Sequence, residues 1–294
     1  MFNELILFSA KLKYNSVPVL IHSIETKEAE ETYKSITGLT ILDNELFIIT
    51  LCSSYIEVYN SIELCFSRRM NLKELIDPMD ITSCNISKCL YILDGKDFLK
   101  SAEILRVDSN AKLIKNWSIG NCHGYTVSIR PTDDSNVIVS DGFCHVLKKY
   151  SRDGQFINKI NLSVEAGIHF PRHAIKLSNG DFLFSCDSRY EEPHRICTVD
   201  AYGRLKRSFG GNCGPSNEQM KRPVYLSVDE NGFVLVADQF NSRVLLLDSN
   251  LTFQREILSE EKHGLRHPAR IILDESSRIL VADESRILIF QMKE

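Results

Sequence analysis

Several features that mark other classes of protein are absent from this sequence of 294 residues. No stretch approaches the roughly 18 consecutive apolar residues of a membrane-spanning helix, so we expect no membrane association. Residues 1–8 have no basic segment ahead of their apolar run, and Glu4 interrupts that run, which argues against a secretory signal peptide. Nine cysteines occur without a C-x-x-C pair, which excludes zinc-ribbon and RING spacing.

The cysteines that are present lie mostly within apolar runs, as Cys186 does after Leu183 and Phe184. A thiol in such a run behaves as a small hydrophobic side chain. An odd number of scattered cysteines is not typical of a disulfide framework, so we expect a reducing, cytoplasmic location.

A basic excess is also missing, because the formal net charge is -4 and the isoelectric point is about 6.1. Proteins that bind nucleic acid over their whole surface are usually basic, since phosphate neutralisation supplies most of their affinity. The overall charge therefore does not favour nucleic-acid binding, and only a local basic patch stays open.

Local catalytic fingerprints are missing as well. No G-x-S-x-G stretch, P-loop or dinucleotide-binding glycine pattern occurs. His169 and His173 have the i, i+4 spacing of helical zinc ligands, but Pro171 lies between them and excludes a helix there. We expect no catalytic residue, no metal and no cofactor, and we predict that the chain is not an enzyme.

What the chain does contain is an internal repeat. Residues 222–229 (RPVYLSVD) match residues 267–274 (HPARIILD), and each leads into a second run ending in Val-Ala-Asp and then a Ser-Arg step. Weaker copies precede them, and the end of the second run recurs every 44 to 51 residues, with a proline 15 or 16 residues before it in four copies. Two constant spacings indicate a true repeat. The residues ending the second run are Thr50, Asp94, Asp141, Asp187, Asp238 and Asp283.

Each copy contains short β-branched or aromatic runs separated by turn signals such as Asn179-Gly180 and Asn231-Gly232. About four strands in about 45 residues is typical of a propeller blade. We therefore predict an all-β, six-bladed β-propeller that forms one unit over residues 1–294. The blades are expected at about 36–72, 78–118, 124–162, 171–210, 222–258 and 267–291.

The last copy stops after its third strand, which would leave an unpaired edge. The segment Val17 to Ser23 is a candidate for the missing fourth strand, because its Pro18 suits an outer edge. We predict that it completes the last blade, and that a charged linker up to residue 35 leads into the first. Residues 1–13 have no place in this scheme.

The Pro-led inner strands, the stretch VLVADQFNSRVLLLD at 234–248 and the stretch SRILIF at 285–290 resemble the NHL-repeat family. The resemblance covers roughly residues 36 to 291. The domain that these residues form is similar to the C-terminal propellers of TRIM-NHL proteins. It implies a six-bladed propeller that recognises protein or RNA on one face. The RING, B-box and coiled coil of TRIM-NHL proteins have no counterpart in this sequence, so it would not be a ubiquitin ligase by itself.

The recurring aspartates are predicted to be structural, because a catalytic group would occur once rather than in every blade. A carboxylate at the end of a strand accepts backbone N–H groups in the turn that follows. The structural repeat positions are Asp94, Asp141, Asp187, Asp238 and Asp283.

The loops entering the inner strands and the loops between second and third strands should share one face of a propeller. In the last three copies, these loops contain both arginines and aromatic residues. Such side chains anchor protein interfaces, and they also hold single-stranded RNA through phosphate contacts and base stacking. The candidate binding residues are Arg172, His173, Tyr190, Arg222, Tyr225, Phe240, Asn241, Arg243, His267 and Arg270.

We predict a non-catalytic binding platform, a monomer, for a protein or peptide partner. A single-stranded RNA-binding NHL domain is the first alternative. A metal-dependent lyase or lactonase-like propeller is the second, although His123, His173 and His267 do not share a repeat position. Spacing does not show that Asp80 and Asn241 would converge on a calcium ion.

Overall fold

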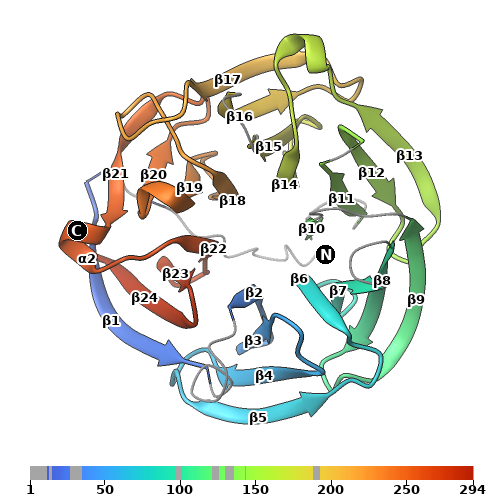
Figure 1. Ribbon diagram of the computed structural model, residues 1–294. Coiled ribbons are helices and arrows are strands. Elements are labelled where there is room, and N and C mark those ends of the chain that lie inside the picture. Colours follow the sequence, from blue (N-terminus) through green and yellow to red (C-terminus); the bar gives the residue numbers. More distant parts are fainter. Residues whose placement is uncertain are drawn as a thin grey trace, which may run out of the picture.

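The computed structural model describes residue 12 and residues 15–26, 35–96, 101–120, 126–129, 136–142, 144–187 and 193–293. Within these residues, six antiparallel sheets of four strands each stand in a ring around a central axis (Figure 1). Regular helix in this part is confined to short turns at Val164–Ala166 (η2), Gln239–Asn241 (η3) and Glu260–His263 (α2). The chain is an all-β, six-bladed β-propeller, which confirms the predicted fold class.

Blades 1 to 3 follow one another along the chain, and each places its first strand nearest the axis (Figure 1). Their strands are β2 (Ile36–Leu42), β3 (Glu45–Thr50), β4 (Tyr55–Asn60) and β5 (Phe66–Asn71); β6 (Asp77–Cys84), β7 (Cys89–Lys96), β8 (Ser101–Asp108) and β9 (Leu113–Gly120); β10 (Thr126–Ile129), β11 (Val137–Asp141), β12 (Val146–Tyr150) and β13 (Phe156–Asn161).

Blades 4 and 5 repeat this order, and blade 6 takes its outermost strand from the N-terminal part of the chain. Their strands are β14 (Pro171–Lys176), β15 (Phe182–Cys186), β16 (His194–Val199) and β17 (Leu205–Gly211); β18 (Pro223–Val228), β19 (Val234–Asp238), β20 (Arg243–Leu247) and β21 (Phe253–Ser259); β22 (Pro268–Leu273), β23 (Arg278–Asp283), β24 (Arg286–Lys293) and β1 (Val17–Glu25).

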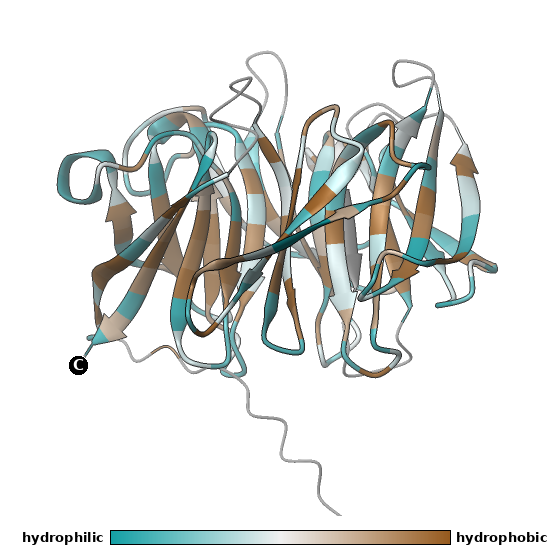
Figure 2. Ribbon diagram, turned by 90° about the horizontal axis from the view of Figure 1, so that it is seen from below, coloured by the Kyte–Doolittle hydropathy of each residue, from teal (hydrophilic) through white to brown (hydrophobic). Residues whose placement is uncertain are grey.

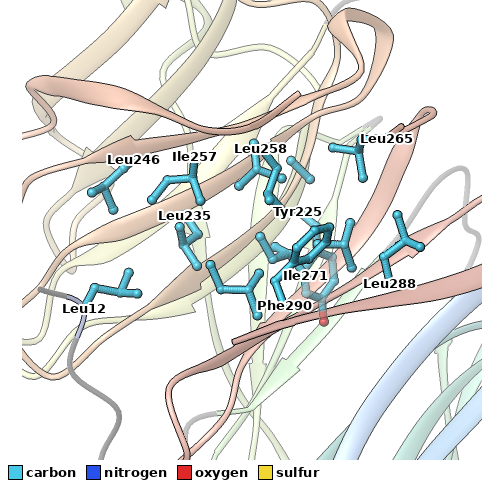
Figure 3. Close-up of a cluster of buried hydrophobic side chains, with 14 of the residues drawn as sticks. Leu12, Tyr225, Leu235, Leu246, Ile257, Leu258, Leu265, Ile271, Leu288 and Phe290 are labelled. Atoms are coloured by element: carbon cyan, nitrogen blue, oxygen red, sulfur yellow. The ribbon is translucent and has the colours of Figure 1, made fainter. Parts of the chain in front are cut away.

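The hydrophobic core is divided among the six junctions between blades. Six clusters of buried side chains each draw on two neighbouring blades, and Figure 3 shows the one between blades 5 and 6. Second strands such as β19 are buried on both faces because a blade packs on either side, whereas the outer strand β13 is exposed at every residue except Ile160. This explains why the inner runs of the repeat are continuously apolar.

The N-terminal strand closes the ring as predicted. β1 pairs antiparallel with β24, with Val17 opposite Lys293 and Glu25 opposite Arg286, and Pro18 lies on the outer edge. The sheet order β1-β24-β23-β22 joins the two ends of the described chain in one blade (Figure 1).

Leu12 extends this closure to a neighbouring blade, which the sequence analysis did not foresee. Its side chain is buried in the cluster between blades 5 and 6 (Figure 3), and its N–H donates to the Asp229 carboxylate at 3.0 Å. The Arg255 guanidinium donates to the carbonyl oxygen of Ser16. These contacts tie the start of β1 to blade 5. No helix in the described ranges is long and apolar enough to cross a membrane.

Candidate binding face at the Pro-led loops

The loops entering the inner strands and the loops between second and third strands gather on one face of the ring, here named the Pro-led face. Seen from the side in Figure 2, hydrophobic segments lie within the strands and hydrophilic segments gather in the loops at both faces. The candidate residues of the repeat therefore stand above the apolar clusters that join neighbouring blades.

The residues that precede three of the prolines have an unusual backbone. Phe170, Arg222 and His267 have φ angles of 43°, 60° and 46°, in the left-handed region. A following proline favours extended backbone, and a large side chain makes a positive φ costly, by about 1–3 kcal/mol for each residue. Strain of this kind, repeated at three adjacent junctions, marks the Pro-led face as a constrained surface.

A side chain of the preceding blade accepts the backbone N–H of each strained residue. His145 Nδ1 accepts from Phe170 at 3.4 Å, and His194 Nδ1 accepts from Arg222 at 3.2 Å. Ser242 Oγ accepts from His267 at 3.4 Å. The acceptors lie at the start of the third strand in blades 3, 4 and 5, so each one ties its blade to the next.

An exposed group of cationic and aromatic side chains lies between blades 5 and 6; we name it the rim cluster (Lys221, Arg222, Phe240, Arg266 and His267). Phe240 is 44% exposed, and the Arg222 guanidinium lies over its ring, 4.9 Å from the centroid. His267 meets the other edge of this ring in a T-shaped contact with centroids 5.8 Å apart. Lys221, Arg266 and His267 are also exposed.

The backbone holds Phe240 in this position. Its N–H donates to the carbonyl oxygen of Lys221 at 3.0 Å, and the neighbouring Gln239 N–H donates to that of Arg222 at 3.2 Å. The turn η3 ends at Ser242, whose φ of 49° reverses the chain into β20. The aromatic ring is thus fixed on the loop that carries the two cations.

The aspartates of the repeat lie beneath this surface and are buried. Asp238 is bonded to Arg243 at 2.8 Å, and Asp283 to Arg286 at 2.9 Å. Burial raises the pKa of Asp238 and of Asp283, against the lowering effect of their hydrogen bonds. Asp238 and Asp283 are thus paired with arginines outside the rim cluster, and the repeat aspartate that pairs with a member of the cluster is Asp187, which lies 3.4 Å from Arg222.

The hydrogen bonds of these aspartates differ from the expected ones. Asp238 accepts from the N–H of Lys221 at 2.7 Å, and Asp283 accepts from the N–H of Arg266 at 2.8 Å, both in loops that precede inner strands. Among the described repeat aspartates, only Asp141 accepts a backbone N–H of the turn that follows it, from Cys144 at 3.0 Å. The carboxylates therefore join the first strand of a blade to the second.

The other two repeat aspartates lie in the same type of network. Asp94 accepts from the N–H groups of Ile76 and Asp77 and forms an ion pair with Lys96 at 2.7 Å. Burial raises the pKa of Asp94, against the lowering effect of Lys96. Asp187 is bonded to Arg172 at 2.9 Å and lies 3.4 Å from the Arg222 guanidinium.

Three candidates from the sequence analysis belong to the scaffold rather than to an accessible rim. Arg243 is only 5% exposed and donates to the carbonyl oxygens of Pro215, Ser216 and Gln219, besides Asp238. Its role is to hold a loop. In the same way, the amide of Asn241 donates to Asp238 and to the carbonyl oxygen of Gly214, and Arg172 is committed to Asp187.

A second polar group lies nearer the axis; we name it the axial network (Asp80, His173, Tyr225 and Arg270). Each member stands two residues after a proline, at an equivalent position of the inner strands β6, β14, β18 and β22. Arg270 reaches from blade 6 past blade 1 to blade 2, where Nε donates to Asp80 at 3.3 Å and Nη2 to the Met79 carbonyl oxygen at 2.9 Å.

The aromatic half of the axial network is stacked. The rings of His173 and Tyr225 are 3.7 Å apart at 20°, and the Arg270 guanidinium lies 5.0 Å from the Tyr225 centroid. His173 Nδ1 accepts from the N–H of Leu226 at 3.3 Å, so the neutral ring carries its proton on Nε2. Burial, and secondarily Arg270, lowers the pKa of His173 to about 3.

The network is therefore a donor-rich assembly at neutral pH. Burial raises the pKa of Tyr225, with a further increase from Asp80, so its hydroxyl keeps its proton. His173, Tyr225 and Arg270 are consequently buried or largely buried axial residues, and not the rim residues that the sequence predicted. Tyr190 and His123 lie outside the described residues.

The described side chains do not converge on a metal site. No group of three or more His, Cys, Asp or Glu residues in the described ranges is arranged to hold an ion. Asp80 and Asn241 lie in separate networks, the first with Arg270 and the second with Asp238.

Sequence reasoning missed the acceptors His145, His194 and Ser242. Their signal was available, because each stands at or just before the start of a third strand and a Pro-preceding residue follows about 25 to 28 positions later. A polar side chain recurring there would have predicted the blade-to-blade hydrogen bonds.

No protein-family model matches the chain, and no curated protein is similar to it in sequence. Solved structures are similar in fold. A streptogramin B lyase has a TM-score of 0.64 at 9% identity, over 92% of this chain and 97% of its own. Virginiamycin B lyase from Staphylococcus aureus has a TM-score of 0.62 at 12% identity, over 92% and 98%.

Two further structures have a TM-score of 0.60. One is hydrazine synthase of Kuenenia stuttgartiensis, at 12% identity over 87% of this chain and 95% of its own. The other is a Bacteroides caccae protein of unknown function, at 13% identity over 82% and 87%. At such identities the similarity establishes a shared fold, and the chain is to be described as a six-bladed β-propeller.

Proposed function

We propose that this propeller is a non-catalytic binding platform of the NHL type, and that its rim cluster holds an acidic segment of a partner protein. The observation that carries the proposal is the exposed Phe240 ring, fixed between Arg222 and His267 above buried, ion-paired carboxylates. Aromatic and arginine side chains of this kind are the usual anchors of protein interfaces.

Charge supports an acidic partner. The whole chain has a formal net charge of -4, yet Lys221, Arg222 and Arg266 lie together on one face. A local cationic patch on an acidic protein orients an approaching acidic segment and raises its association rate at low salt.

Preorganisation supports it as well. The hydrogen bonds from η3 to the Lys221–Arg222 backbone fix the ring before any partner arrives. Binding to a surface that is already ordered avoids part of the entropic cost of association.

The test is selection from a library of random 12-residue peptides displayed against the purified chain. We expect enrichment of Asp and Glu beside an aromatic residue, and loss of binding by about tenfold or more in Phe240→Ala and in Arg222→Ala. Arg204→Ala is the matched control, because Arg204 is exposed and lies outside the rim cluster, where it contacts Asp200 and the Tyr202 ring. Failure to enrich such peptides, or equal binding by all variants, would overturn the proposal.

Single-stranded RNA is the second candidate, and the Arg222–Phe240 stack favours it because a base can stack on the same exposed ring. Incubation with a random RNA pool at two salt concentrations separates the two candidates. A motif enriched only at low salt and lost in Arg222→Ala would replace the peptide ligand by RNA.

The same purified chain can be used to test for an enzymatic role. Two structural neighbours are named as lyases, and the axial network offers a neutral histidine, a phenol and a guanidinium close together. Incubation with virginiamycin B followed by mass spectrometry should show no product if the chain is a binding platform. Product that forms with the native chain and not with His173→Gln would make it an enzyme.

A further inference from the structure

A cavity of about 330 Å³ opens between blades 4 and 5 on the face opposite the Pro-led loops. Its volume is at the lower end of the range of small-molecule sites, about 300–1,000 Å³. We name it the interblade pocket. Blade 4 contributes Leu177, Ser178, Asn179, Leu183, Thr198 and Arg207, and blade 5 contributes residues 228–232, Val234 and residues 249–251.

One row of side chains crosses the blade 4 wall. Leu183 on β15 is the register partner of Thr198 on β16, and Thr198 is the partner of Arg207 on β17. Directly opposed residues in antiparallel strands project from the same face with Cβ atoms about 5 Å apart. An apolar group, a hydroxyl and a guanidinium therefore stand in sequence from the inside of the pocket to its mouth.

The Thr198 hydroxyl has no hydrogen-bond partner among the described residues, although Thr198 is only 3% exposed. Most buried polar groups of native proteins are satisfied, so an unsatisfied one on the wall of a cavity requires a reason. A ligand atom in the interblade pocket supplies one.

Arg207 provides the charge. It is exposed and forms no ion pair with any described residue. Two carboxylates lie on the opposite wall. Asp229 is committed elsewhere, because its oxygens accept from the N–H groups of Asn231, Phe233 and Leu12 at 2.8 to 3.0 Å, and Glu230 forms no ion pair with Arg207. The guanidinium is therefore available to an anion.

The deeper part of the opposite wall is apolar. Val228 on β18 is the register partner of Val234 on β19, and both Val234 and Leu251 are buried. With Leu183 these side chains form a hydrophobic surface below the cation.

We propose that the interblade pocket binds a small branched aliphatic carboxylate. The carboxylate accepts from Arg207 and from the Thr198 hydroxyl, and the alkyl group packs on Leu183, Val234 and Leu251. A phosphate suits the site less well, because one guanidinium and one hydroxyl supply few donors and the floor is apolar.

The test is a titration of the full chain with isovalerate, followed by NMR of methyl-labelled Leu, Val and Thr. We expect shifts of the Thr198, Leu183 and Val234 methyl signals with a Kd of about 1 mM, as seven non-hydrogen atoms allow. Isovaleramide, which lacks the charge, and acetate, which has a methyl in place of the branched alkyl group, should each bind about tenfold more weakly or not at all.

Variants decide which groups bind. Arg207→Gln and Thr198→Val should each weaken isovalerate by about tenfold or more, since both remove a hydrogen bond to a charged group. Arg204→Gln, which changes a neighbouring exposed cation outside the pocket, should bind like the native chain. Thr198→Val loses an unsatisfied hydroxyl, so the variant should stay folded and a lost affinity is not due to unfolding.

Three results would overturn the proposal: no methyl shift with isovalerate, equal affinity of isovalerate for native chain and Arg207→Gln, or equal affinity for isovalerate and isovaleramide. The pocket and the rim cluster lie on opposite faces, so failure of either proposal leaves the other standing.

Discussion

Gly38 occupies in blade 1 the position that the members of the axial network occupy in blades 2, 4, 5 and 6. A Cβ at this residue would lie 2.7 Å from the backbone nitrogen of Ile81 and 2.9 Å from its Cγ2. Glycine here allows β2 and β6 to approach closely, which is a packing requirement rather than a turn requirement.

Gly38→Ala should therefore destabilise the protein by about 1–3 kcal/mol, since a backbone atom is the obstacle and one strand must shift. The free energy of unfolding in urea measures the effect. Gly211→Ala is the matched control, because an added Cβ there meets nothing within 4 Å. A loss no larger than that of the control would show that β2 moves away freely.

His173 makes stability depend on pH. Its pKa is about 3 in the folded chain and about 6.5 in an unfolded one, so between these values the unfolded state binds more protons. The free energy of unfolding should rise with pH across this window, by up to about 1.4 kcal/mol per pH unit from this residue, and the contribution is complete above about pH 6.5.

Urea unfolding of native chain and His173→Gln between about pH 4.5 and 7.5 measures this slope. The variant should be less steep by about one proton, whatever its absolute stability. His194 and His263, whose pKa values burial also lowers, contribute equally to both chains. Equal slopes would mean that His173 is not buried as a neutral ring.

At the scale of elements, the N-terminal segment stabilises two blades. β1 supplies the fourth strand of blade 6, and Leu12 fills the core beside blade 5. The hydrogen bond from the Leu12 N–H to Asp229 fixes the backbone at the point where Leu12 packs into this core.

Leu12→Ala should lower the free energy of unfolding by about 2–5 kcal/mol, the usual range for a buried leucine truncated in a packed core. Val17→Ala is the control from the same segment, since Val17 is 58% exposed and should change stability by no more than about 0.5 kcal/mol. Thermal and urea unfolding of both variants measure the difference. Similar free energies of unfolding for the two variants would show that Leu12 does not contribute to the core.

At the scale of the whole molecule, two links close the ring, one at its outer edge and one near its axis. β1 and β24 join the chain ends on the outside, and Arg270 with Asp80 joins blade 6 to blade 2 near the axis. Both links connect segments distant in sequence, so ring closure is a property of the complete propeller.

Arg270→Met should cost about 3 kcal/mol or more, because it removes the cation beside a fully buried carboxylate. The double variant Asp80→Leu, Arg270→Met should recover part of this loss, since it removes both charges. Arg266→Met, at an exposed residue of the loop that leads into β22, is the control. Urea unfolding of these variants and of Asp80→Leu alone gives the coupling free energy, and additive losses would show that the pair does not act as a unit.

Sequence alone determined the number of blades, the closing strand and the recurring aspartates. These features follow from spacing, because each blade repeats the same local alternation of apolar runs and turns. The terminal strand was predictable from an unpaired edge, since a missing partner is visible in a repeat.

Only the tertiary structure decided which arginines are exposed. Arg222, Arg243 and Arg270 all lie at or near the start of a strand, yet Arg222 lies in the rim cluster, Arg243 holds a loop and Arg270 links blade 6 to blade 2. The position of each side chain depends on partners that can be distant in sequence, such as Asp80, which lies 190 residues before Arg270. A repeat pattern encodes the contacts within a blade, whereas contacts between blades depend on how the closed ring brings distant strands together.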